Sequence, residues 1–99
     1  MKAVLVCFAG MSTSIMMNKM KKAAAKKDVD LDIKAIPLSE LEENLEGVEV
    51  VLLGPQIRYA YPEVEKLTEG KIPAVVISSV DYGMMNGEKV LNEAIKAIE

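Results

Sequence analysis

The chain contains one cysteine, Cys7, at the point where an apolar run ends and a segment of small and hydroxylated residues begins. That segment, residues 8–14, reads FAGMSTS. A thiolate is a strong nucleophile, and a glycine-containing turn lets a ligand come close to backbone N–H groups. The hydroxyl groups of Ser12, Thr13 and Ser14 add neutral hydrogen-bond donors. These residue types, in this order, indicate a nucleophile placed in an anion-binding cradle.

Four apolar, β-branched runs at residues 3–6, 31–36, 50–53 and 74–77 predict buried strands. Helices are predicted at residues 14–27, 39–47 and 62–70, and at the C-terminus, where an apolar face is formed by Val90, Leu91, Ala94, Ile95 and Ile98. Ser39 and Glu42 have the spacing of a capping box, and Pro62 suits a first helical turn. Alternating strands and helices predict one α/β domain with a small parallel sheet covered on both faces.

The first predicted helix is amphipathic. Met16 and Met20 fall on its apolar stripe and are expected in the core, whereas Lys19, Lys22 and Lys26 fall on a solvated face. The other interpretation of these lysines is a surface for an acidic partner.

The position of Cys7 matches a general property of open parallel sheets, in which ligands bind beyond the carboxyl ends of the strands. The helix after Cys7 would present unpaired N–H groups and the positive end of its dipole, roughly +0.5 charge. One of the hydroxyl residues Ser12, Thr13 and Ser14 is expected to cap that helix. Such surroundings favour the thiolate form, so a phosphoryl group is the expected ligand.

Each feature alone has an ordinary structural explanation. A lone cysteine near a strand end is often a small buried hydrophobe, and GMSTS could be only a capped helix start. The combined order of strand, cysteine, small-residue turn, hydroxyls and helix is what favours phosphate chemistry. A regulatory or anion-binding module with a structural Cys7 therefore stays open as the non-enzymatic alternative.

Composition excludes several classes of function. The net charge of −3 gives no reason to expect nucleic acid as a partner. With no histidine and one cysteine, no zinc or haem constellation is expected, and no cofactor is predicted. No apolar run approaches the roughly 18 residues that span a bilayer, and no signal peptide is evident. We therefore expect a cytoplasmic protein without direct membrane insertion.

An enzymatic alternative is a low-molecular-weight tyrosine phosphatase, whose cysteine loop follows the pattern C-x5-R-[ST]. The arginine of that loop clamps the phosphoryl group. Here Thr13 stands at the arginine position, and the only arginine of the chain is Arg58. Neutral donors should hold a phosphocysteine without directing water onto it, which favours a carrier over a hydrolase. The Walker pattern is also missing, so a nucleotide donor has no support.

Three segments, CFAGMSTSIMMNKM, VVLLGPQIRYAYPEV and DYGMMNGEKVL, resemble the enzyme IIB subunits of the lactose/cellobiose (chitobiose) class of the bacterial sugar phosphotransferase system (PTS). The resemblance runs essentially from end to end and implies a single IIB domain over residues 1–99. It also implies a Rossmann-like fold similar to the low-molecular-weight phosphatases, with a four-stranded parallel sheet of order 2-1-3-4 and helices on both faces.

The resemblance further implies a role. In that family a cysteine takes phosphate from a histidine of enzyme IIA and passes it to a sugar bound by the membrane subunit IIC. The implied phosphocysteine is Cys7, and the implied phosphate-binding loop is Phe8, Ala9, Gly10, Met11, Ser12, Thr13 and Ser14. The implied sugar is a β-linked disaccharide such as cellobiose, lactose or chitobiose. Phe8 departs from the small residue expected there, which removes a loop hydroxyl and leaves the backbone cradle.

Residues after the third and fourth strands are candidate contacts to the phosphoryl group or to a partner. They are Gln56, Arg58, Tyr59, Asp81 and Tyr82. A surface turn leading into a helix explains each of the first three equally well. Asp81 is a candidate helix cap or general acid, and Met11 a candidate partner contact.

Overall fold

Strands and helices alternate along the chain, as the sequence pattern predicts. The computed structural model describes residues 1–7 and 11–99, and the side chains of Met11 and Ser12 lie outside that description. The strands are β1 (Lys2–Val6), β2 (Asp32–Ile36), β3 (Val50–Leu53) and β4 (Ala74–Val76). The helices are α1 (Met11–Lys26), α2 (Tyr61–Thr68), α3 (Ser79–Gly83) and α4 (Gly87–Ile98), and the 3₁₀ helices are η1 (Leu38–Glu40), η2 (Glu42–Asn44) and η3 (Pro55–Ala60). No helix within the described residues has the length and apolar character needed to cross a membrane.

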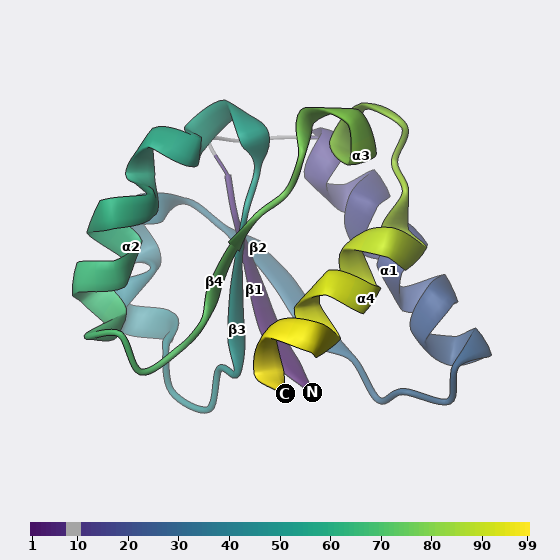
Figure 1. Cartoon of the computed structure of the whole chain (residues 1–99), viewed down its shortest axis with the longest axis horizontal. Coiled ribbons are helices and arrows are strands. Elements are labelled where there is room, and N and C mark those ends of the chain that lie inside the picture. The colour runs from purple at the N-terminus through teal and green to yellow at the C-terminus, as the bar shows by residue number, and fades with distance from the viewer. Residues whose placement is uncertain (8–10) are drawn as a thin grey trace.

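The four strands pair in parallel in the order β2-β1-β3-β4, which confirms the order implied by the resemblance. In this register Val6 lies opposite Ile36 on one side and Leu53 on the other. Leu53 in turn lies opposite Val76 of β4. The carboxyl ends of all four strands therefore meet at one edge of the sheet, at the top of Figure 1.

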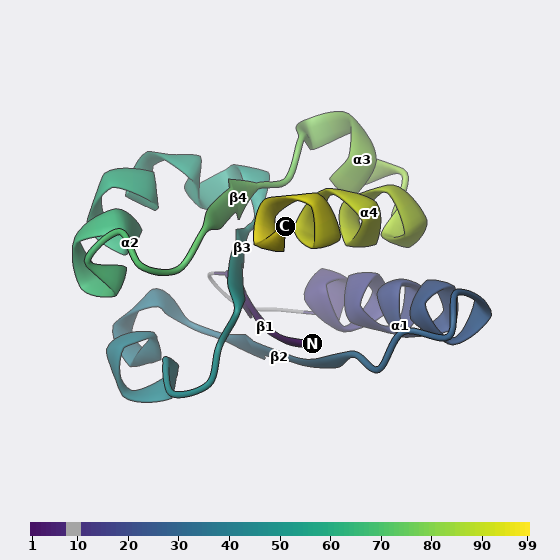
Figure 2. The same cartoon turned by 60° about the horizontal axis from the view of Figure 1, so that its bottom comes forward.

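Two apolar layers cover the two faces of the sheet. The helices α1 and α4 lie on one face, and α2 with the 3₁₀ helices lies on the other (Figures 1 and 2). Leu5 packs in the first layer with Met20 and Leu91, whereas its neighbour Val6 packs in the second layer with Val64. Because β3 and the part of β1 after Lys2 are buried on both faces, they are continuously apolar rather than alternating.

Helix α1 begins at Met11, earlier than the predicted start at residue 14. Met16 and Met20 are fully buried and the lysines Lys19, Lys22 and Lys26 are exposed, as the amphipathic pattern predicts. The prediction that one of the three hydroxyl residues caps this helix is wrong, because all three lie inside its first turn. Hydroxyl residues are tolerated there, since the N–H groups of the first turn have no intrahelical partners in any case.

The predicted helix at residues 39–47 is replaced by the two short helices η1 and η2, and the capping box of Ser39 and Glu42 does not form. Leu41 is the only fully buried residue of this segment, so no apolar stripe holds a longer helix against the sheet. Side-chain bonds secure the turns instead: Lys34 Nζ donates to Asn44 Oδ1 (2.6 Å), and Asn44 Nδ2 donates to the Glu40 carbonyl oxygen (2.7 Å).

The segment after β3 becomes helical at Pro55, well before the predicted start at Pro62. Non-helical dihedral angles at Ile57 (φ −122°, ψ 26°) kink the chain, and α2 follows from Tyr61 with Pro62 in its first turn, as expected for proline. The helix ends at Glu69, which adopts a left-handed conformation with φ 54°. The kink turns the residues of η3 over the carboxyl edge of the sheet before α2 runs back along its face.

A further short helix, α3, follows β4, and its cap differs from the predicted one. Ser78 Oγ accepts a hydrogen bond from the Asp81 backbone N–H (3.1 Å), so Ser78 is the N-cap. The proposal that Asp81 caps a helix is therefore wrong. Ser78 holds the extended conformation that an N-cap requires, whereas Asp81 lies within the helix with its side chain buried.

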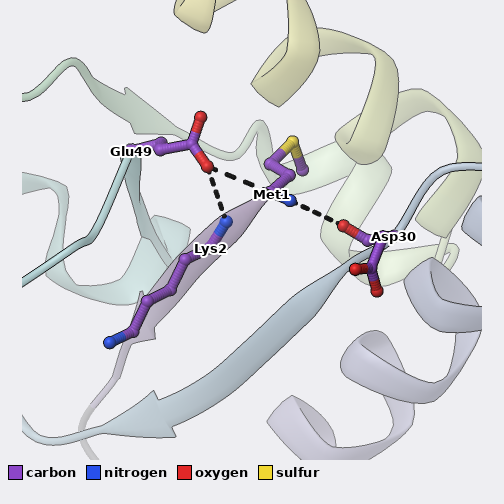
Figure 3. Close-up of polar contacts among 4 residues, drawn as sticks. All are labelled: Met1, Lys2, Asp30 and Glu49. Atoms are coloured by element: carbon purple, nitrogen blue, oxygen red, sulfur yellow. Dashed lines mark hydrogen bonds and ion pairs between the residues drawn. The ribbon is translucent and has the colours of Figure 1, made fainter.

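At the opposite, amino edge of the sheet, polar contacts join the starts of the strands (Figure 3). A carboxylate oxygen of Glu49, just before β3, accepts a hydrogen bond from the Lys2 backbone N–H (3.1 Å) and lies 3.9 Å from the Met1 amine. The Met1 amine also donates to the carbonyl oxygen of Asp30 (2.7 Å). These contacts fix β1 between the segments that lead into its two neighbours.

The tightest helix contact yields a stability prediction. A Cβ added at Gly87 would lie 2.5 Å from the Lys19 carbonyl carbon and 2.6 Å from the Met20 nitrogen, so α4 packs directly on the backbone of α1. We expect Gly87→Ala to lower the free energy of unfolding by about 1–3 kcal/mol, because a helix backbone cannot move aside as a side chain can. Urea denaturation followed by circular dichroism measures the change.

The matched control is Gly83→Ala, because nothing lies within 4 Å of a Cβ added at Gly83. We expect this helical substitution to be neutral or to stabilise the fold by up to about 1 kcal/mol. Equal destabilisation by both substitutions would contradict the close contact between α1 and α4.

Candidate functional site

Cys7 directly follows β1 at the carboxyl edge of the sheet. Its backbone N–H donates to the Ile36 carbonyl oxygen (3.1 Å) and so continues the ladder between β1 and β2. The side chain is partly exposed. The backbone of Cys7 is therefore fixed by the sheet, and its own N–H is already used, so any ligand of the thiol must be held by other donors.

Cys7 lines an open pocket of about 370 Å³. Cys7 shares its lining with Pro37, Leu38, Ser39, Ile57, Tyr59 and Glu63. One wall comes from the segment after β2, and the other comes from η3 and the first turn of α2. The segments that follow β2 and β3, the two strands on either side of β1, therefore form the two walls of this pocket.

The predicted phosphate-binding loop is described only in its second half. Phe8, Ala9 and Gly10 lie outside the described residues, as do the side chains of Met11 and Ser12. Thr13 and Ser14 belong to the first turn of α1, where the Thr13 side chain is buried and Ser14 is exposed. The 16-residue helix α1 therefore begins close to Cys7 in sequence, and its N-terminal turn carries partial positive charge.

Gln56 and Tyr82 both lie near Gly54, which follows β3 at its carboxyl end. A Cβ added at Gly54 would lie 2.8 Å from Gln56 Oε1 and 3.9 Å from Tyr82 Cε2. The Gly54 N–H donates to the Val6 carbonyl oxygen (3.2 Å), which ties this corner to the residue before Cys7. A second hollow of about 360 Å³ opens there, lined by Pro55, Gln56, Ser79, Tyr82 and Gly83. The structure thus brings together two of the predicted contact residues from different connections.

Arg58 and Tyr59 both lie on η3, but only Tyr59 lines the pocket of Cys7. The Tyr59 side chain is 67% exposed, so its ring is a surface feature of the pocket rim. Arg58 is exposed and does not line that pocket. The one arginine of the chain is therefore not in the position of a phosphatase loop arginine.

Asp81 lines neither of the two hollows and is buried on α3, within reach of Lys89 on α4. Its carboxylate is 6% exposed, and Oδ2 lies 3.5 Å from Lys89 Nζ. Its backbone oxygen accepts a hydrogen bond from the Asn86 N–H (2.9 Å). These contacts connect α3 to the start of α4, so Asp81 has a structural part in holding the helix that carries Tyr82.

Sequence reasoning did not single out Glu63, although its side chain lines the same pocket as Cys7. In the sequence it is an ordinary acidic residue in the first turn of a helix, where it interacts favourably with the helix dipole. The available signal was its place after Pro62, on the connection that follows the strand beside β1. Leu38 and Ser39, on the other wall, were missed because residues 39–47 were expected to form a regular helix.

The comparisons with known proteins agree with this geometry. Residues 2–93 match the family described as PTS system, Lactose/Cellobiose specific IIB subunit. The galactose-specific EIIB component of the PTS from Lactococcus lactis subsp. cremoris is 44% identical over 96 residues, covering 91% of this chain and 89% of the relative. The oligo-beta-mannoside-specific EIIB component of Bacillus subtilis is 33% identical over 95 residues, covering 95% and 92%.

A solved structure supports the same assignment. The solution structure of the cellobiose-specific phosphotransferase IIB component from Borrelia burgdorferi superposes with a TM-score of 0.82 at 44% identity, covering 99% of this chain and 91% of that one. Its similarity extends over the sheet and both helical layers described above. This chain is a member of the lactose/cellobiose-specific IIB family, the sugar-specific phosphotransfer subunits of the PTS.

Proposed function

We propose that Cys7 is the phosphoryl acceptor of this subunit, taking the group from a phosphohistidine of enzyme IIA and passing it to a sugar bound by the membrane subunit IIC. The observation that carries the proposal is the position of the thiol. It stands at the carboxyl edge of the sheet, lines an open pocket and precedes the N-terminus of α1. A nucleophile at this edge can meet a donor that approaches from solvent.

In the first transfer, sulfur forms a bond to phosphorus while the bond from phosphorus to the histidine nitrogen breaks. The thiol proton ends on that nitrogen, so the histidine leaves as neutral imidazole. In the second transfer, a sugar hydroxyl oxygen bonds to phosphorus as the bond from phosphorus to sulfur breaks, and the hydroxyl proton ends on the released thiolate, which regenerates the thiol. A base for that hydroxyl is expected on IIC. Positioning and electrostatic stabilisation do most of the work in both steps.

The cradle for the phosphoryl oxygens is proposed to be residues 8–14, that is Phe8, Ala9, Gly10, Met11, Ser12, Thr13 and Ser14. Support comes from the start of α1 at Met11, whose first-turn N–H groups have no intrahelical acceptors. The Cys7 N–H is not available to this cradle, because it is bonded to Ile36. The donors must therefore come from the residues that follow the cysteine.

The other predicted contacts receive separate roles in this proposal. Tyr59, on the exposed rim of the Cys7 pocket, would meet a partner protein. Gln56 and Tyr82, which both line the neighbouring hollow near Gly54, would reach the phosphoryl group or the acceptor sugar from there. Arg58 would meet a partner from outside the pocket, and Asp81 would act through the position of Tyr82 rather than as a general acid.

The substrate class is proposed from the relatives, whose names refer to galactose, oligo-beta-mannosides and cellobiose. A β-linked disaccharide is the substrate class we infer. The proposed setting is the cytoplasm, with association to the membrane through IIC. The phosphatase alternative finds less support in this geometry, because Arg58 lies outside the lining of the Cys7 pocket.

The central prediction is a covalent adduct. Incubation with phosphoenolpyruvate, enzyme I, the histidine phosphocarrier and a IIA of the lactose/cellobiose class should add one phosphoryl group, because only one thiol is present. Intact-mass spectrometry measures the adduct. The adduct should require IIA and should be absent from Cys7→Ser.

Two results would contradict the carrier assignment. Hydrolysis of para-nitrophenyl phosphate without adduct formation would indicate the phosphatase. Absence of both reactions, with a IIA that phosphorylates another member of the family, would indicate a structural cysteine.

A second prediction concerns access to the thiol. Because Cys7 is partly exposed and lines an open pocket, we expect one equivalent of Ellman's reagent to react with the folded protein. The absorbance of the released thionitrobenzoate is read with and without urea, and Cys7→Ser gives the blank. A thiol that reacts only after unfolding would support the structural alternative.

A further inference from the structure

Glu63 is the one formally charged side chain lining the Cys7 pocket, among the residues that the structure describes. It lies in the first turn of α2, on the wall formed by the connection after β3. The remaining lining residues are neutral or apolar apart from the cysteine itself. A negative charge therefore lines the same pocket as the thiol that the proposed function phosphorylates.

The charged groups on the neighbouring elements do not offset Glu63 within the pocket. Arg58 of η3 and Glu40 of η1 are both exposed, have opposite signs and do not line it. A side-chain phosphoryl group carries about −1.5 to −2 charges near pH 7, which exceeds the charge of the thiol that it replaces. Phosphorylation thus increases the repulsion between Cys7 and the Glu63 carboxylate.

We propose that Glu63 destabilises the phosphorylated form of Cys7 relative to the unphosphorylated form and so keeps the phosphoryl group transferable. The inference rests on the proposed function and assigns a residue that sets its transfer equilibrium. A cationic side chain beside the phosphoryl group would stabilise the phosphorylated form relative to the free thiol, whereas an anionic one destabilises it. In this proposal, neutral hydrogen-bond donors and the N-terminus of α1 stabilise the phosphoryl group, and the Glu63 carboxylate destabilises it.

Water and salt weaken this repulsion, because Glu63 is exposed. The effect should therefore be a few-fold change that depends strongly on ionic strength. Screening is slight at about 10 mM salt, where the Debye length is about 30 Å, and strong at about 1 M, where it is about 3 Å. This dependence separates an electrostatic role from a purely structural one.

The test is the transfer equilibrium between phosphorylated IIA and this protein. Wild type, Glu63→Gln and Glu65→Gln are each equilibrated with the same IIA, and intact masses give the ratio of phosphorylated to free species on both proteins. We expect Glu63→Gln to raise the equilibrium constant toward phosphocysteine about threefold to tenfold at about 10 mM salt, and less than about twofold at about 1 M.

Glu65→Gln is the matched control, since it removes the same charge from the same helix at an exposed residue that does not line the pocket. At low salt it should change the constant clearly less than Glu63→Gln does, because its carboxylate does not line the pocket. Glu63→Asp, which keeps the charge, should stay within about twofold of wild type. Thermal unfolding of all variants reports any loss of the favourable contact between Glu63 and the helix dipole.

The proposal is overturned if Glu63→Gln leaves the equilibrium unchanged at low salt, or if both glutamine variants shift it equally. It is also overturned if the shift persists at 1 M salt and follows the loss of thermal stability. A wild-type protein that accepts no phosphoryl group from IIA refutes the proposed function itself, whereas normal phosphorylation without a Glu63 effect refutes only this inference.

Discussion

The parallel register of β1 between β2 and β3 is the constraint on which the rest of the structure depends. Parallel strands end at a common edge, and at this edge backbone hydrogen bonds from the Cys7 N–H to Ile36 and from the Gly54 N–H to Val6 tie β1 to both neighbours. The first bond fixes the cysteine backbone, and the second fixes the corner at which η3 begins. A one-residue slip of β1 would exchange Leu5 and Val6 between the two apolar layers, so the packing of both faces holds the cysteine in place.

The elements that long apolar patterns specify could be predicted from the sequence. The strands and the last helix are close to their predicted bounds, because continuous β-branched runs and a single apolar helix face admit few other arrangements. The burial of Met16 and Met20 and the exposure of Lys19 follow from the same helical spacing. The position of Cys7 at the carboxyl edge could be predicted once the end of the first strand was identified.

The predictions that were wrong fall on short segments, where one or two contacts decide the conformation. Leu41 is the only fully buried residue of the segment at residues 39–47. No regular helix forms there, so Ser39 and Glu42 do not act as a capping box. At α3 the cap is Ser78, because the chain leaves β4 in an extended conformation and turns only there. The walls of the Cys7 pocket are built from these segments. Leu38, Ser39 and Glu63 could therefore be assigned to the pocket only once the relative positions of the two connections were known.

The charges around the pocket bear on whether this site suits a phosphoryl carrier or a phosphatase. A phosphatase needs strong stabilisation of the phosphoryl group during attack by water, which an arginine supplies bidentately. A carrier needs the phosphoryl group to remain of similar free energy on donor, cysteine and acceptor, so excess stabilisation at the middle step slows the last one. In this chain the arginine lies outside the pocket, the helix end offers only partial charge, and the single charged residue lining the described part of the pocket is acidic. The absence of a cationic side chain from the described lining and the presence of Glu63 in it both disfavour a tightly held phosphoryl group.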